Sequence, residues 1–253
     1  MRRPPPLSLT TLALVAVAFL ALPLVAVVGR APWRSVPSLV TSDAAVTALR
    51  MSLECSFGAL ALAMLAGVPL AWLLARREFR GKALLRALVL VPLVLPPVVG
   101  GVALLLAFGR HGLVPLHLAF TTWGAIAAEA FVAMPFLVLA VEGALGSVDD
   151  RYEEVAATLG AGPLATFRRV TMPLVMPGLA AGAALAWARA LGEFGATITF
   201  AGNLPGRTQT LPLAVYVALQ QDPDAAVAIS LLLLALSLAV LLWLRGRWRV
   251  TRR

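Results

Sequence analysis

Charged residues are scarce in this chain. They make up 13% of its 253 residues, whereas soluble domains carry about 25%. Hydrophobic residues make up 60% of the chain, and its mean hydropathy is +0.91. Several apolar runs reach the roughly 20 residues that a helix needs to cross a bilayer. This composition excludes an ordinary soluble domain and predicts an all-α, polytopic membrane protein.

Residues that bind metals and nucleotides are also few. Cys55 is the single cysteine, so no disulfide can form within the chain. His111 and His117 are the two histidines, and neither has a partner at metal-ligand spacing. A Gly-x-x-x-x-Gly-Lys-Ser/Thr phosphate loop is missing. We therefore expect no catalytic residue, metal or cofactor on this chain, and a separate subunit must bind any ATP and Mg²⁺.

The apolar runs predict six transmembrane helices in one domain, residues 1–253. The expected spans lie at about 8–28, 47–75, 84–108, 121–141, 174–199 and 225–244. The third run contains Pro92, Pro96 and Pro97, which predict a bent or broken helix. A polar connection is expected at 29–45 and a short helix at 213–220.

The basic residues divide unevenly between the two sides that six spans define. Fifteen lie on the side of the termini and of the polar segment 142–173, five lie on the other side, and Arg189 falls within the fifth run. Because cytoplasmic loops are enriched in Lys and Arg, both termini and this segment are predicted to be cytoplasmic. The basic residues form no stripe with aromatics, so the net charge of +9 does not indicate nucleic-acid binding. The arginines of 245–253 favour contact with anionic membrane lipid.

The polar segment predicts two short helices joined by a glycine turn. Ser147 or Asp149 can cap the first helix, and Gly160 suits the left-handed residue that closes it. Pro163 suits the first turn of the second helix, which Pro173 is expected to end.

The first of these helices has a small apolar face. Val155 and Leu159 are four residues apart and therefore share a face, with Ala156 close beside them. Such a face favours insertion into a groove on another protein. An amphipathic loop lying on lipid headgroups fits the helix signals equally well.

The same segment resembles the EAA loop of the permease subunits of ATP-binding-cassette (ABC) importers. That pattern is Glu-Ala-Ala, three residues, Gly, nine residues, Ile, one residue and Leu-Pro. Every spacing is kept here, on Glu154-Val155-Ala156, Gly160, Val170 and Met172-Pro173. The resemblance implies the ABC importer permease fold and a coupling helix that docks on a cytoplasmic ATPase dimer. The implied coupling residues are Glu153, Glu154, Val155, Ala156, Leu159, Gly160 and Pro173.

Two further stretches narrow the resemblance. Residues 189–216, RALGEFGATITFAGNLPGRTQTLPLAVY, and residues 92–101, PLVLPPVVGG, are similar to molybdate permeases. This implies a molybdate permease, with tungstate included and sulfate or thiosulfate as the alternative. It also implies a homodimer working by alternating access in the bacterial inner membrane, and an extracytoplasmic oxyanion-binding protein. A homodimer would also cover the small-residue face of the fifth span, where Gly178 and Gly182 can pack helices or dimerise.

The end of the fifth span holds the candidates for the permeation pathway or gate. Arg189 and Glu193 are four apart and form either a structural ion pair or a gate. Gly192 and Gly195 allow close backbone approach or unwinding of the helix. The neutral polar residues offer hydrogen-bond donors to a passing dianion. The full set is Arg189, Gly192, Glu193, Gly195, Thr197, Thr199 and Asn203.

Two other classes of membrane protein agree less well with the sequence. A secondary transporter leaves the EAA spacing unexplained. An integral-membrane enzyme needs nucleophiles or metal ligands at one depth, and the acids at 149, 150, 153 and 154 have no His, Cys or Ser/Lys dyad beside them.

Overall fold

The computed structural model describes residues 7–149 and 151–248, and all regular structure within them is helical. The all-α prediction is confirmed. Five helical stretches are long and apolar enough to cross a membrane. They are α1 (Leu7–Gly29), α3 (Asp43–Arg76), α6 (Thr122–Gly146), the stretch Pro163–Leu191 that includes α9 (Met172–Leu191), and α12 (Pro223–Trp248).

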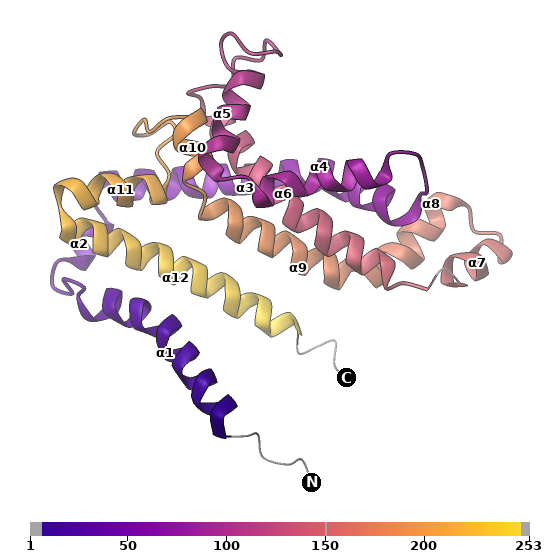
Figure 1. Ribbon diagram of the computed structural model, residues 1–253, viewed down its shortest axis with the longest axis horizontal. Helices are drawn as coiled ribbons and strands as arrows, with labels where there is room; N and C mark the ends of the chain where they lie inside the picture. The colour runs from indigo at the N-terminus through magenta and orange to yellow at the C-terminus, as the bar shows by residue number, and fades with distance from the viewer. Residues whose placement is uncertain (1–6, 150, 249–253) are drawn as a thin grey trace.

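A sixth candidate span is a pair of apolar helices that is broken at its prolines, and the sequence predicts this break. Helix α4 (Lys82–Val94) and helix α5 (Pro97–Phe108) meet at an angle of 119°. Leu95 and Pro96 between them are extended, with ψ of 132° and 131°, because a residue that precedes proline avoids the helical region. Figure 1 shows α5 standing across the direction of the other long helices.

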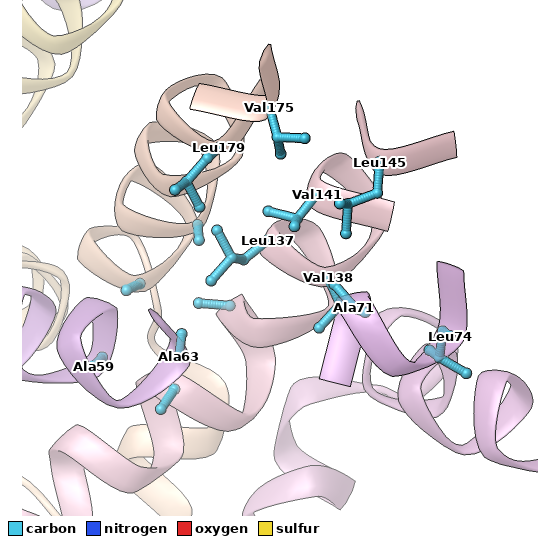
Figure 2. Packing of buried hydrophobic residues seen from close by; sticks show 14 residues of the cluster. Ala59, Ala63, Ala71, Leu74, Leu137, Val138, Val141, Leu145, Val175 and Leu179 are labelled. Carbon is cyan, nitrogen blue, oxygen red and sulfur yellow. The ribbon is translucent and has the colours of Figure 1, made fainter. Parts of the chain in front are cut away.

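The helices α3, α6 and α9 form the main core. Figure 2 shows Leu137 and Val141 of α6 facing Leu179 of α9, with the small Ala59 and Ala63 of α3 nearby. All five side chains are buried. Alanines on α3 allow its backbone to approach that of α6 closely. Such close contact is what holds helices together in a bilayer, because the apolar lipid provides no hydrophobic driving force between them.

The glycines at 178 and 182 lie in this core. A Cβ added at Gly182 would lie 2.7 Å from the Cβ of Ala140, and one added at Gly178 would overlap Ala144. Both alanines belong to α6. The Gly-x-x-x-Gly spacing therefore packs helices within one chain, and the expectation that this face needs a second copy is wrong.

The polar segment lies at one end of the molecule, here called the loop end. It contains α7 (Arg151–Thr158), α8 (Pro163–Thr166) and a π-helical turn η1 (Phe167–Thr171) that runs directly into α9. The prediction that Pro173 ends the second loop helix is wrong. The π turn precedes this proline and its wider spacing accommodates a ring that would otherwise clash with the carbonyl four residues earlier.

The opposite end is made of shorter elements. Helix α2 (Val36–Val40) lies inside the predicted polar connection, and α11 (Leu211–Gln221) lies at the predicted short helix. The fifth span was expected at about 174–199, with unwinding at Gly192 and Gly195 as one of two possibilities. Helix α9 ends at Leu191 and α10 (Gly195–Phe200) follows after a break. Helices α1 and α12 both have their free ends directed toward the loop-end side in Figure 1.

Candidate functional site

The local geometry of α7 follows from its caps. The Asp149 carboxylate (Oδ1) accepts a hydrogen bond from the backbone N–H of Arg151 at 3.0 Å. Ser147 instead closes α6, where its hydroxyl donates to the carbonyl of Ala144. Gly160 has a φ of +82°, the left-handed conformation expected of a residue that ends a helix. Pro163 occupies the first turn of α8, as predicted.

One face of α7 is apolar and points away from the chain. Val155 is 57% exposed and Leu159 is 82% exposed, and Tyr152 on the same face is also exposed. Ala156, expected beside them, is turned inward and buried. None of the described residues covers this exposed pair, which is the arrangement expected of a surface that another protein covers.

Glu153 and Glu154 differ in their surroundings although they are adjacent. Glu154 is exposed. The Glu153 carboxylate accepts hydrogen bonds on one oxygen (Oε1) from the Arg76 guanidinium at 3.2 Å and from the Thr171 hydroxyl at 2.8 Å. Sequence reasoning placed Glu153 in the coupling loop but had no signal for either partner, because Arg76 is 77 residues away and Thr171, 18 residues away, belongs to a different helical turn.

The break in the fifth span is organised by a buried carboxylate. Glu193 is 1% exposed, and its Oε2 lies 2.5 Å from the guanidinium of Arg189. Its other oxygen accepts a hydrogen bond at 2.8 Å from the backbone N–H of Ala196, at the start of α10. The predicted ion pair is therefore present, and the same side chain satisfies a donor that the helix start leaves unpaired.

The two broken spans meet at their breaks. A Cβ added at Gly195 would lie 2.8 Å from the Cβ of Pro97, and one added at Gly101 would lie 2.6 Å from the Cβ of Thr199. Helices α5 and α10 therefore pack with their backbones in close approach. Of the two roles expected for the glycines, unwinding occurs around Gly192 and close approach occurs at Gly195.

The neutral polar candidates lie inside this packed region. The hydroxyl of Thr199 donates to the carbonyl of Gly195 at 2.8 Å. The hydroxyl oxygen of Thr197 and the amide oxygen of Asn203 are buried and have no hydrogen-bond partner among the described residues. Sequence reasoning did not select Pro97 and Gly101 as site residues, although PLVLPPVVGG contains both.

Glu129 is a second buried acid near the break. It is 1% exposed, lies on α6, and has an oxygen without a hydrogen-bond partner among residues 7–149 and 151–248. Glu54 is also within a membrane-spanning helix, and it pairs with Arg50 at 2.6 Å on an exposed face of α3. Within the described ranges, no three His, Cys, Asp or Glu residues gather as a metal site would require.

Comparison with known proteins agrees with this geometry. The family described as "Binding-protein-dependent transport system inner membrane component" matches residues 67–247. The molybdenum transport system permease protein ModB of Mycobacterium tuberculosis is 48% identical over 222 residues, which are 85% of this chain and 84% of that protein. The sulfate transport system permease protein CysT of Salmonella typhimurium is 39% identical over 225 residues, 85% of this chain and 80% of that protein.

Solved structures share the fold at lower sequence identity. A bacterial alginate ABC transporter, solved in complex with an alginate pentasaccharide-bound periplasmic protein, superimposes with a TM-score of 0.73 at 17% identity. The match covers 97% of this chain and 94% of that one. A transporter component rather than an enzyme accounts for the fold, the exposed loop and the matched residues together. The chain belongs to the family of inner membrane components of binding-protein-dependent transport systems.

Proposed function

We propose that this chain is the permease subunit of an ATP-driven importer of molybdate, with tungstate as a second substrate. Its 48% identity to a molybdenum transport permease carries the proposal. The lower identity to a sulfate permease, 39%, makes sulfate the alternative substrate.

The partners follow from the two ends of the molecule. The exposed Val155–Leu159 face of α7 docks on a cytoplasmic ABC ATPase, which puts the loop end and both termini in the cytoplasm of a bacterial cell. Since each chain has one such loop and ATPases of this class work as pairs, two copies of the chain form the pathway. An oxyanion-binding protein delivers substrate at the opposite end.

Transport proceeds by alternating access. ATP and Mg²⁺ are bound by the ATPase dimer, whose closure moves the two coupling helices and opens the pathway outward. The substrate enters from the docked binding protein, and hydrolysis returns the pathway to the inward state. The residues of this chain do no covalent chemistry; they transmit movement and exclude ions until the pathway opens.

The break at residues 192–194 is the proposed gate. The Arg189–Glu193 pair holds the end of α9 against the start of α10, so movement of α9 must act on this pair. The net charge of the pair is zero, and a dianion passing it meets no strong cationic trap. Passage requires release as well as binding, which favours neutral donors such as Thr197 and Asn203.

A glycine substitution tests the coupling assignment. Gly160 has a positive φ and nothing within 4 Å of an added Cβ, so Gly160→Leu strains the turn by about 1–2 kcal/mol without a clash. We expect membrane insertion to persist and substrate-stimulated ATP hydrolysis by the assembled complex to be lost. Gly143→Leu is the control, because Gly143 also has no neighbour within 4 Å and has no positive φ. Normal uptake and hydrolysis by Gly160→Leu would refute the assignment.

Competition experiments test the substrate. Proteoliposomes that contain the permease, its ATPase and its binding protein should take up molybdate, and excess tungstate should suppress this uptake. Excess sulfate should have little effect. Suppression by sulfate equal to that by tungstate would support the alternative substrate.

A further inference from the structure

Glu153 lies on the inner side of α7. Successive residues of a helix are rotated by about 100°, so Glu153 and Val155 are about 200° apart and point in nearly opposite directions. Val155 is exposed, whereas the Glu153 carboxylate reaches Arg76 and Thr171. The residue therefore belongs to the side of α7 that faces its own chain and does not belong to the docking face.

One oxygen of this carboxylate joins three elements. Arg76 is the last residue of α3, and Thr171 is the last residue of the π turn that leads into α9. Both donate to Oε1 of Glu153 on α7. The Arg76 side chain is 14% exposed and that of Glu153 is 35% exposed, so this contact is shielded from water more than a surface pair. Hydrogen bonds between charged groups are stronger than neutral ones.

A groove of about 710 Å³ runs beside this contact. Its walls come from α3 on one side and from the loop on the other, and they are mostly apolar. The backbone of α7 packs against α8 and η1, and the Glu153–Arg76 pair bridges from α7 to α3 at the groove. Among the residues that line the groove are Val68, Pro69, Trp72, Ala157, Leu164 and Phe167.

We propose that Glu153 is a positioning residue that transmits movement of the docked α7 to both α3 and α9. This inference rests on the proposed function. When the ATPase pulls on the Val155–Leu159 face, the carboxylate on the other side of α7 draws Arg76 and Thr171 with it. Without the carboxylate, α7 can still dock on the ATPase. The loop can then move relative to α3 across the groove without moving the membrane-spanning helices.

The experiment measures substrate taken up per ATP hydrolysed by the full complex in proteoliposomes. In Glu153→Ala this ratio should fall by about tenfold, because the hydrogen bonds from Arg76 and from Thr171 to the carboxylate are both lost. Binding of the ATPase should be unchanged. Glu153→Gln keeps the acceptor without the charge and should fall by about threefold. Glu78→Ala is the matched acidic control. Glu78 lies in the connection between α3 and α4, is 88% exposed, and pairs with Lys82 of α4 rather than with α7 or α9.

A charge exchange makes the test decisive. Arg76→Glu alone should lower the ratio, and Arg76→Glu combined with Glu153→Arg should restore at least half of it. If Glu153→Ala does not assemble, recovery of both assembly and coupling in the exchanged variant supports the role, and failure to recover overturns it. An unchanged ratio in Glu153→Ala also overturns it. If the unmodified chain itself does not bind the ATPase, the proposed function fails and this role fails with it.

Discussion

The two ends of the molecule hold their elements together in different ways. At the loop end, α7 turns Leu159 and Val155 outward and is tied to its own chain by side-chain hydrogen bonds to Glu153. At the opposite end, α5 and α10 meet through Gly101 and Gly195 with no room for an added methyl group. The first arrangement leaves exposed apolar side chains that another protein can cover, and the second is a closely packed contact between two helices of one chain. Stability and coupling are therefore expected to respond separately to mutation.

The largest expected effect is at the opposite end. Gly101→Leu places a side chain against the Cβ of Thr199 and 2.9 Å from the carbonyl oxygen of Ala196, part of the α10 backbone. Because backbone cannot move aside cheaply, overpacking should cost at least about 3 kcal/mol. The measurements are the yield of monodisperse protein in detergent and its melting temperature. Gly146→Leu, with nothing within 4 Å of its added Cβ, is the control, and equal stability of the two variants would contradict the packing.

A substitution on the docking face should have the reverse pattern. Leu159→Asp changes a side chain that is 82% exposed, so the stability of the permease should change by less than about 0.5 kcal/mol. Binding of the ATPase should weaken by at least about tenfold, as expected for loss of a central apolar contact. Titration of labelled ATPase against purified permease measures this.

The matched control for that titration lies in the loop that follows α5. Leu113 is 90% exposed in this loop, and Leu113→Asp should leave ATPase affinity unchanged. If the two aspartate variants bind the ATPase equally well, the Val155–Leu159 face is not the docking surface.

The smallest expected effect concerns the departure from the EAA pattern. Val155 stands where the pattern has alanine, and it is 57% exposed. Val155→Ala removes two carbon atoms, and because the residue is 57% exposed the ATPase cleft would newly cover only about half of their area. This area corresponds to about one buried CH₂ group, so affinity should fall by about fourfold. The same titration measures it. Tighter binding by the variant would show that the cleft fits alanine better than valine.

The two breaks show which parts of the fold a sequence can predict. The bend after α4 was predictable because Pro96 and Pro97 act on the residues next to them. For the fifth span, Gly192 and Gly195 offered unwinding as one of two roles, but the sequence could not choose between them, because the break depends on a Glu193 side chain that pairs with Arg189 and caps α10. A glutamate four residues after an arginine is equally consistent with one unbroken helix.

Features of the loop that depend on neighbouring residues were predicted well, whereas its contacts with distant residues were not. The left-handed Gly160 and the position of Pro163 follow from the neighbouring residues, and both predictions are confirmed. Pro173 was misjudged because a proline favours a helix end unless the turn before it is widened. The contact between Glu153 and Arg76 joins residues 77 apart in sequence, and a single sequence gives no sign of such a pairing.

The π turn before Pro173 fixes an angular relation between the two functional regions. Helix runs from Pro163 to Leu191 over 29 residues, a rod of about 43 Å. A π turn holds one residue more than an α turn, and one residue corresponds to a rotation of about 100° about the helix axis. The azimuth of Arg189 relative to the Val155–Leu159 face is therefore set by η1. Removing one residue from Phe167–Thr171 would leave the contacts within α9 and the neighbouring Arg189–Glu193 pair intact. It would turn that pair by about 100° relative to the Val155–Leu159 face, so η1 sets the orientation of the proposed gate relative to the proposed docking face.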